Sequence, residues 1–234
     1  MDDRKPEGRT NDGTEMAFLA PPTDRDYPRA IQRILRQAEG PTPTTSRFEP
    51  HHGEFPRRVD FDLIIVTGSS ARIGTPEPWF APLADYLERA VRARTPILGV
   101  CFGHQFLADQ FGGTVRSLPE RQTTVSTIER TQAGRIDPLF SGLPKTFESF
   151  VYHHDHVTAL PPDANCLARN ETGVQAFALT DRPVYGIQFH PEFTESMAQD
   201  VGYGGPIDIE TSRQIYSNFI TGAAGSRSTP TQDA

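Results

Sequence analysis

The sequence is poor in cysteine and in long apolar runs, and each shortage excludes a class of protein. Its 234 residues include only two cysteines, Cys101 and Cys166, too few for a disulfide framework and typical of a reducing compartment. The most apolar stretches, such as residues 63–66, are far shorter than the roughly 20 residues that span a bilayer. No apolar run follows the charged N-terminus, so it does not resemble a secretory signal. We therefore expect a cytoplasmic protein that does not associate with a membrane.

An excess of positive charge is also absent. The 23 basic residues are outnumbered by 30 acidic ones, which gives a formal net charge of −7. Attraction to phosphates needs a basic face, so we expect no nucleic-acid partner. A chain of this length can bury a sizeable core in one large domain or at most two small ones.

The domain organisation follows from composition. Residues 1–14 are polar and predict a flexible N-terminal arm. Residues 221–234 are mainly Gly, Ala, Ser, Thr and Pro, which predicts a disordered tail. Residues 15–220 are expected to form the domain between them.

Strand and helix patterns alternate in the first half of this domain. Short apolar runs predict strands at residues 16–20, 63–66 and 96–100. Amphipathic spacing predicts helices at residues 28–40, 82–94 and 105–111. Extended patterns then follow from residue 123 onward, notably at residues 147–157, 174–179 and 184–189, before a closing helix at 211–220. This order predicts an open α/β sheet, whereas residues 41–60, with four prolines, show no clear pattern.

Cys101 is a candidate nucleophile because of its setting. It lies between a predicted buried strand and a helix, and Gly99 and Gly103 permit a tight turn there. A helix N-terminus favours the thiolate, and its free N–H groups can hold a developing oxyanion. The alternative is a small buried residue at a strand end, and this pattern alone leaves both open. Cys166 has no such setting and is expected to fill the core or a loop.

His190 is the candidate base. It follows the extended run 185–189, and an open α/β sheet places its active site at the carboxyl ends of the strands. Pro191 stops the strand, and the carboxylate of Glu192 can then reach the far nitrogen of the imidazole. Taken alone, this tripeptide is also compatible with a structural or surface histidine.

Residues 152–157, Tyr-His-His-Asp-His-Val, raise the hypothesis of a metal site. In an extended segment, His154 and His156 share one face, and His153 and Asp155 share the other. Two ligands on a face are few for zinc, so we expect no metal there.

Two motifs together resemble the class I, or triad, glutamine amidotransferases. Residues 99–105, Gly-Val-Cys-Phe-Gly-His-Gln, resemble the nucleophile motif, and residues 186–192, Gly-Ile-Gln-Phe-His-Pro-Glu, resemble the His-x-Glu motif. The resemblance covers residues 61–201 and is closest to stand-alone members similar to the amidotransferase domain of GMP synthase. It implies a flavodoxin-like, doubly wound fold with a mostly parallel central sheet flanked by helices.

The resemblance also implies a catalytic triad of Cys101, His190 and Glu192. Cys101 would attack the side-chain amide of glutamine, His190 would move the proton to the leaving ammonia, and Glu192 would orient the imidazole. The γ-glutamyl thioester would then be hydrolysed to glutamate, and this implied mechanism requires no metal or organic cofactor. Main-chain N–H groups of Phe102 and of the Gly68–Ser69 turn would form the oxyanion hole.

The implied substrate pocket contains Gln105 and residues of the segment 152–157. His153, Asp155 and Val157 match the family's segment, whereas Tyr152 and His154 are bulkier than its pattern. We therefore expect Gln105, Tyr152, His154 and Asp155 to contact L-glutamine or another γ-glutamyl compound.

Three functional hypotheses follow. The chain is a glutaminase that passes ammonia to a separate acceptor-activating synthetase, or it is a self-contained γ-glutamyl hydrolase or peptidase with the same triad. The bulky side chains of Tyr152 and His154 favour the second hypothesis. The third is a non-catalytic regulatory module on this fold, which the joint presence of Cys101, His190 and Glu192 disfavours.

Overall fold

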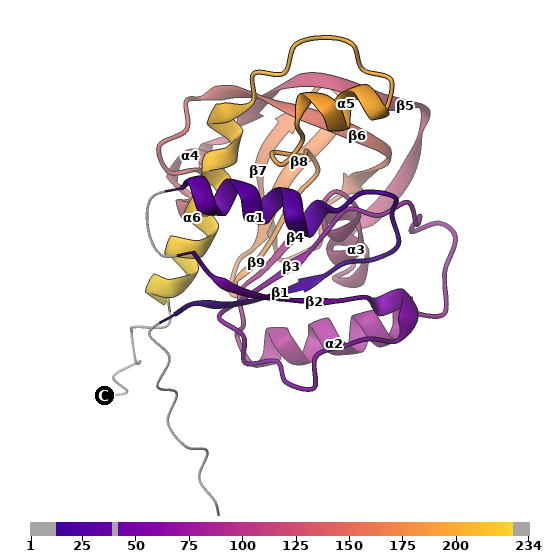
Figure 1. Ribbon diagram of the computed structural model, residues 1–234, viewed down its shortest axis with the longest axis vertical. Helices are drawn as coiled ribbons and strands as arrows, with labels where there is room; N and C mark the ends of the chain where they lie inside the picture. The colour runs from indigo at the N-terminus through magenta and orange to yellow at the C-terminus, as the bar shows by residue number, and fades with distance from the viewer. Residues whose placement is uncertain (1–12, 39–41, 227–234) are drawn as a thin grey trace, which may run out of the picture.

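One nine-stranded sheet organises the fold of the computed structural model, which describes residues 13–38 and 42–226 (Figure 1). Its strands are β1 (Glu15–Leu19), β2 (Thr44–Phe48), β3 (Leu63–Val66), β4 (Ile97–Val100), β5 (Thr114–Arg130), β6 (Thr146–Ala159), β7 (Ala164–Asn170), β8 (Gly173–Leu179) and β9 (Val184–Ile187). The α-helices are α1 (Tyr27–Gln37), α2 (Phe80–Arg92), α3 (Phe102–Gln110), α4 (Gln132–Ile136), α5 (Glu195–Asp200) and α6 (Glu210–Ser226). Two 3₁₀ turns, η1 (Pro50–His52) and η2 (Pro138–Phe140), complete the elements.

The sheet has a parallel half and an antiparallel half. The strand order is β2-β1-β3-β4-β9-β8-β7-β5-β6. The strands from β2 to β9 in this order pair in parallel, and those from β9 to β6 pair antiparallel. The predicted α/β architecture is confirmed as a mixed sheet whose parallel part is wound with helices.

Helices cover both faces of the parallel half. Alternation along β1 directs Met16 and Phe18 into a cluster with α1 and α6, and Ala17 and Leu19 into a cluster with α2 and α3. Figure 1 shows α1 and α6 together on one side of β1 and β2, with α2 on the other side. Because both faces are covered, the strand β3 is apolar and fully buried.

Several boundaries differ from the sequence-based expectations. Helix α3 begins at Phe102, three residues before the predicted start at Gln105, so it directly follows Cys101. Residues 41–60, for which the sequence shows no clear pattern, contain β2. The side chains of this strand are mainly exposed, so it has no apolar run. Strand β7, which carries Cys166, was not predicted either.

The proposed arm and tail fall mostly outside the described residues. Residues 1–12 and 227–234 are not described, so a flexible arm over 1–14 and a tail over 227–234 stay predictions. Helix α6 continues to Ser226, six residues into the segment predicted as a disordered tail from 221. Within the described ranges, no helix is both long enough and apolar enough to cross a bilayer.

Candidate active site

Three neighbouring parallel strands bring the sequence motifs together. Strands β3, β4 and β9 lie side by side, and their carboxyl ends therefore meet at one edge. Gly68 follows β3, Cys101 follows β4 and His190 follows β9. The N–H of Cys101 donates to the carbonyl oxygen of Ile187 at 2.8 Å, which extends the β4–β9 pairing to the candidate nucleophile.

Cys101 occupies a strained turn between β4 and α3. Its φ of 51° lies in the left-handed region, which side-chain-bearing residues rarely adopt. A Cβ on Gly99 would lie 2.4 Å from the Gly103 backbone, and a Cβ on Gly103 would lie 2.3 Å from the Val66 carbonyl oxygen. These glycines allow α3 to approach the sheet closely, and the strained turn places Cys101, which is buried, at the helix N-terminus, where it lines a cavity.

His190 is held by a buried chain of hydrogen bonds. Its Nδ1 lies 2.7 Å from Oε1 of Glu192, and the hydroxyl of Tyr216 donates to Oε2 of Glu192 at 2.6 Å. All three side chains are almost completely buried. Tyr216 comes from α6, so the closing helix fixes the carboxylate, which in turn fixes the imidazole.

The electrostatics of His190 differ from those of the other buried histidines. Burial alone would lower the pKa of His190, but the negative charges of Cys101 and Glu192 outweigh it and raise the pKa to about 10. Burial lowers the pKa of His104 to about 3 and that of His153 to about 4. At neutral pH, His190 is therefore the protonated one of the three. The second nitrogen of His190, Nε2, makes no hydrogen bond within the described residues.

Aromatic rings and the Gly68 turn enclose His190. The ring of Tyr27 stacks on the imidazole at 5.3 Å, and that of Phe193 lies 4.9 Å away. A Cβ on Gly68 would lie 3.2 Å from Cε1 of His190 and 2.9 Å from the Tyr27 ring, so a side chain there would displace them. The Gly68–Ser69 turn thus lies directly beside the imidazole.

Main-chain donors are available next to the thiol. Phe102 is the first residue of α3, and the first N–H groups of a helix have no intrahelical acceptor. In the neighbouring turn, the Ser69 hydroxyl donates to the carbonyl oxygen of Pro22 at 2.7 Å and accepts from the N–H of Ala71 at 3.0 Å. These two side-chain hydrogen bonds fix the conformation of the turn.

Cys101 opens into a cavity of about 350 Å³. Among the residues predicted to contact substrate or form the oxyanion hole, those that line it are Ser69, Gln105, Tyr152, His154 and Asp155. The thiol contacts the carbonyl oxygen of Tyr152 at 3.6 Å. The amide of Gln105 donates to the carbonyl oxygen of Asp155 at 2.7 Å, so residues 152–155 of β6 pass over the start of α3.

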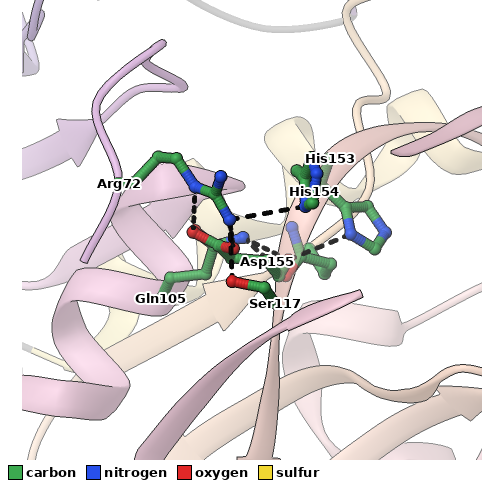
Figure 2. Close-up of polar contacts among 7 residues, drawn as sticks. Arg72, Gln105, Ser117, His153, His154 and Asp155 are labelled. Atoms are coloured by element: carbon green, nitrogen blue, oxygen red, sulfur yellow. Dashed lines mark hydrogen bonds and ion pairs between the residues drawn. The ribbon is translucent and has the colours of Figure 1, made fainter. Parts of the chain in front are cut away.

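An ion pair lies among the residues that line this cavity (Figure 2). Arg72 donates from Nη2 to Oδ1 of Asp155 at 2.5 Å and from Nε to Oδ2 at 3.1 Å, which is a bidentate geometry. The same guanidinium donates to the Ser117 hydroxyl at 2.7 Å and lies 3.4 Å from Nδ1 of His154. Burial would raise the pKa of Asp155, but these partners, chiefly Arg72, hold it below its usual value.

Several residues of the site were missed by sequence reasoning. Tyr216 was identified only as an apolar member of a helix, and Tyr27 was not identified at all. Arg72 follows a central strand at its carboxyl end, and this position of a charged residue is a signal that the sequence did contain. The histidines of segment 152–157 do not form a metal-ligand group in the described part of the chain, whereas Glu49, His51 and His52 have ligand atoms within 4.8 Å of one another outside the cavity.

Comparison with known proteins identifies the family. The family model described as glutamine amidotransferase class-I matches residues 29–201. The chain belongs to the class-I glutamine amidotransferase family. Membership implies enzymatic hydrolysis of an amide, and the solved glutamine amidotransferase of Methylobacillus flagellatus shares the fold, with a TM-score of 0.71 at 19% identity over 90% of this chain and 96% of that one.

The curated relatives differ in their activities. The chain is 35% identical over 138 residues to a GMP synthase [glutamine-hydrolyzing] of Thermosipho africanus, covering 58% of this chain and 25% of that protein. It is 30% identical over 184 residues to a gamma-glutamyl-L-1-hydroxyisopropylamide hydrolase of a Pseudomonas species, covering 70% of this chain and 62% of that protein. The chain therefore spans about a quarter of the GMP synthase that it matches.

Proposed function

We propose that this class-I glutamine amidotransferase cleaves the γ-amide of a γ-glutamyl compound through a covalent intermediate on Cys101. The observation that carries the proposal is the buried His190–Glu192–Tyr216 chain, with contacts of 2.7 and 2.6 Å, beside a cysteine at a helix N-terminus. Charge separation between the thiol of Cys101 and the imidazole of His190 gives a nucleophile and an acid in one step.

The proposed reaction has two halves. The Cys101 sulfur attacks the amide carbon, the carbon–nitrogen bond breaks, and the proton on His190 passes to the leaving amine. Water then attacks the resulting thioester, His190 takes one of its protons, and the carbon–sulfur bond breaks. This restores the Cys101 thiolate and frees a carboxylic acid, which loses its remaining proton to solvent. Glu192 keeps the imidazole oriented in both halves, and the N–H groups of Phe102 and the Gly68–Ser69 turn stabilise the oxyanion.

Glutamine is the first candidate substrate, with a separate synthetase as the ammonia acceptor. The similarity to the amidotransferase part of a GMP synthase supports this version. In it, Gln105 and the backbone of residues 152–155 hold the glutamyl part.

A self-contained γ-glutamyl hydrolase is the second candidate, and the crowded pocket favours it. Arg72 already pairs with the Asp155 carboxylate, and the side chains of Tyr152 and His154 line the cavity. The similarity to a gamma-glutamyl amide hydrolase over 70% of this chain agrees with that version.

Product release tests the proposal. Purified chain is incubated with L-glutamine and with a series of γ-glutamyl amides, and glutamate formation is measured for the wild type and Cys101→Ala. Cys166→Ala is the matched control, because it removes the other thiol outside the cavity. Glutamate release that Cys101→Ala abolishes and Cys166→Ala retains is expected, whereas equal release by all three proteins would contradict the proposal.

A further inference from the structure

Two arginines contact one aromatic ring in the wall of the cavity. Cζ of Arg25 lies 5.1 Å from the centroid of the Tyr152 ring, and Cζ of Arg121 lies 5.2 Å from it. Arg121 also donates from Nη1 to the Tyr152 hydroxyl at 2.9 Å. All three residues line the same cavity as Cys101. We call Arg25, Arg121 and Tyr152 the arginine–tyrosine cluster.

The cluster has unused capacity to bind an anion. Arg121 carries five N–H donors and has no carboxylate partner within residues 13–38 and 42–226. Arg25 pairs with the exposed Asp24, but its own Nε is buried and makes no hydrogen bond in the described residues. A buried cationic N–H without an acceptor is unusual in a folded protein and points to a ligand atom.

The cluster lies on the side of Cys101 from which the amine leaves. The Tyr152 ring lies 6.1 Å from that of Phe193, which lies 4.9 Å from the His190 ring. Arg25 is two residues before Tyr27, whose ring stacks on His190. His190 would protonate the departing amine, so the amine part of a bound substrate points towards this side.

The glutamyl part must then extend in the opposite direction. We place it against Gln105, Arg72 and Asp155, which line the same cavity. Asp155 is three residues from Tyr152 along β6, or about 10 Å in an extended strand. At the amine end, Arg25 is paired with Asp24, which also lines the cavity, whereas Arg121 has no carboxylate partner in the described ranges. This end therefore keeps one uncompensated positive charge, whereas at the other end the charge of Arg72 is balanced by Asp155.

We propose that the substrate is a γ-glutamyl amide whose amine part carries a carboxylate, as in a γ-glutamyl amino acid, and that Arg121 and Arg25 bind this carboxylate. The inference depends on the proposed function, since it names the substrate class of the same thiol site. Ammonia from glutamine would leave the cluster empty, whereas a carboxylate on the amine would satisfy both guanidinium groups.

A matched pair of substrates tests this inference. γ-Glutamylglycine and γ-glutamylglycinamide have the same size and differ only in a carboxylate against a neutral carboxamide. We expect kcat/KM of the wild type to be roughly tenfold or more higher for the acid, the effect of one charge-assisted hydrogen bond. In Arg121→Gln this ratio should fall towards one, and in the control Arg116→Gln, an exposed arginine of β5 outside the cavity, it should not change.

Three results would count against the inference. Equal cleavage of acid and amide by the wild type would overturn it. An Arg121→Gln variant that slows both substrates by the same factor would place Arg121 on the shared glutamyl part instead. In both cases Cys101-dependent cleavage would leave the proposed function intact. Absence of Cys101-dependent cleavage of every γ-glutamyl compound would overturn both proposals.

Discussion

The hydroxyl of Tyr216 is the outermost member of the hydrogen-bond chain, and removing it tests how the base is positioned. In Tyr216→Phe, the shape of the buried ring is retained, but Oε2 of Glu192 loses a donor at 2.6 Å. A hydrogen bond to a charged group contributes about 1.5–3 kcal/mol. When this whole free energy is added to the activation free energy of the reaction, kcat falls roughly 10- to 150-fold. KM should change little, because Tyr216 does not line the cavity.

The control for this variant is Tyr86→Phe. Tyr86 is as buried as Tyr216, and its hydroxyl donates to the Arg58 carbonyl oxygen at 3.1 Å, under α2. Both variants should lose about 1 kcal/mol or more of unfolding free energy in urea titrations. Initial-rate kinetics should show a fall in kcat for Tyr216→Phe alone. A Tyr216→Phe protein that is folded and keeps kcat within about twofold would refute the positioning argument.

Four further predictions follow from the same geometry. In a Cys166→Ser background, His190→Ala should slow the alkylation of Cys101 by iodoacetamide at pH 7 by roughly tenfold, because the imidazole that accepts the thiol proton is removed, and an unchanged rate would contradict this pairing. Glu192→Gln should leave the fold intact and lower kcat by about 10²-fold or more, because the amide favours the wrong imidazole arrangement; unchanged turnover would contradict the role of Glu192. The pKa of His190 in the folded protein, about 10, is higher than its ordinary value of 6.5. The protonated imidazole therefore stabilises the fold fully below pH 6.5, and this stabilisation is lost as the pH rises towards 10. Urea titrations should show that the difference in unfolding free energy between wild type and His190→Gln decreases over that pH range. Gly103→Ala should cost about 1–3 kcal/mol or more in urea unfolding because its Cβ would meet the Val66 carbonyl oxygen at 2.3 Å, whereas Gly74→Ala, with open space around it, should cost little.

The sequence predicted the parts of the fold that depend on local patterns. The apolar runs at β3 and β4 and the amphipathic spacing of α1 and α2 correspond to observed elements. Burial of both faces of a strand leaves a continuous apolar run, and burial of one face of a helix leaves a periodic pattern. Strand β2 left none, since its side chains are mostly exposed at a sheet edge. The start of α3 was placed too late because Phe102, Gly103 and His104 are all buried and show no amphipathic alternation.

The residues of the candidate site also differ in how well the sequence predicts them. Cys101, His190 and Glu192 lie next to strand ends within short motifs, so their positions could be predicted, although their roles remain proposals. The Tyr216–Glu192 bond spans 24 residues and depends on how α6 packs against the sheet, and the Arg72–Asp155 pair spans 83. Contacts of this range arise from tertiary packing, which a single sequence does not display.

The covalent intermediate is the central claim, and trapping it is the most direct test. The chain is mixed with a γ-glutamyl substrate, quenched in acid within milliseconds to seconds, digested and analysed by mass spectrometry. We predict a γ-glutamyl adduct on the peptide that contains Cys101, and we predict that Cys101→Ala forms no adduct. In Glu192→Gln, the amount of adduct should increase if hydrolysis of the thioester slows more than its formation. Cleavage of the substrate by wild type with no adduct on Cys101 at any quench time, and with equal turnover in Cys101→Ala, would contradict the account.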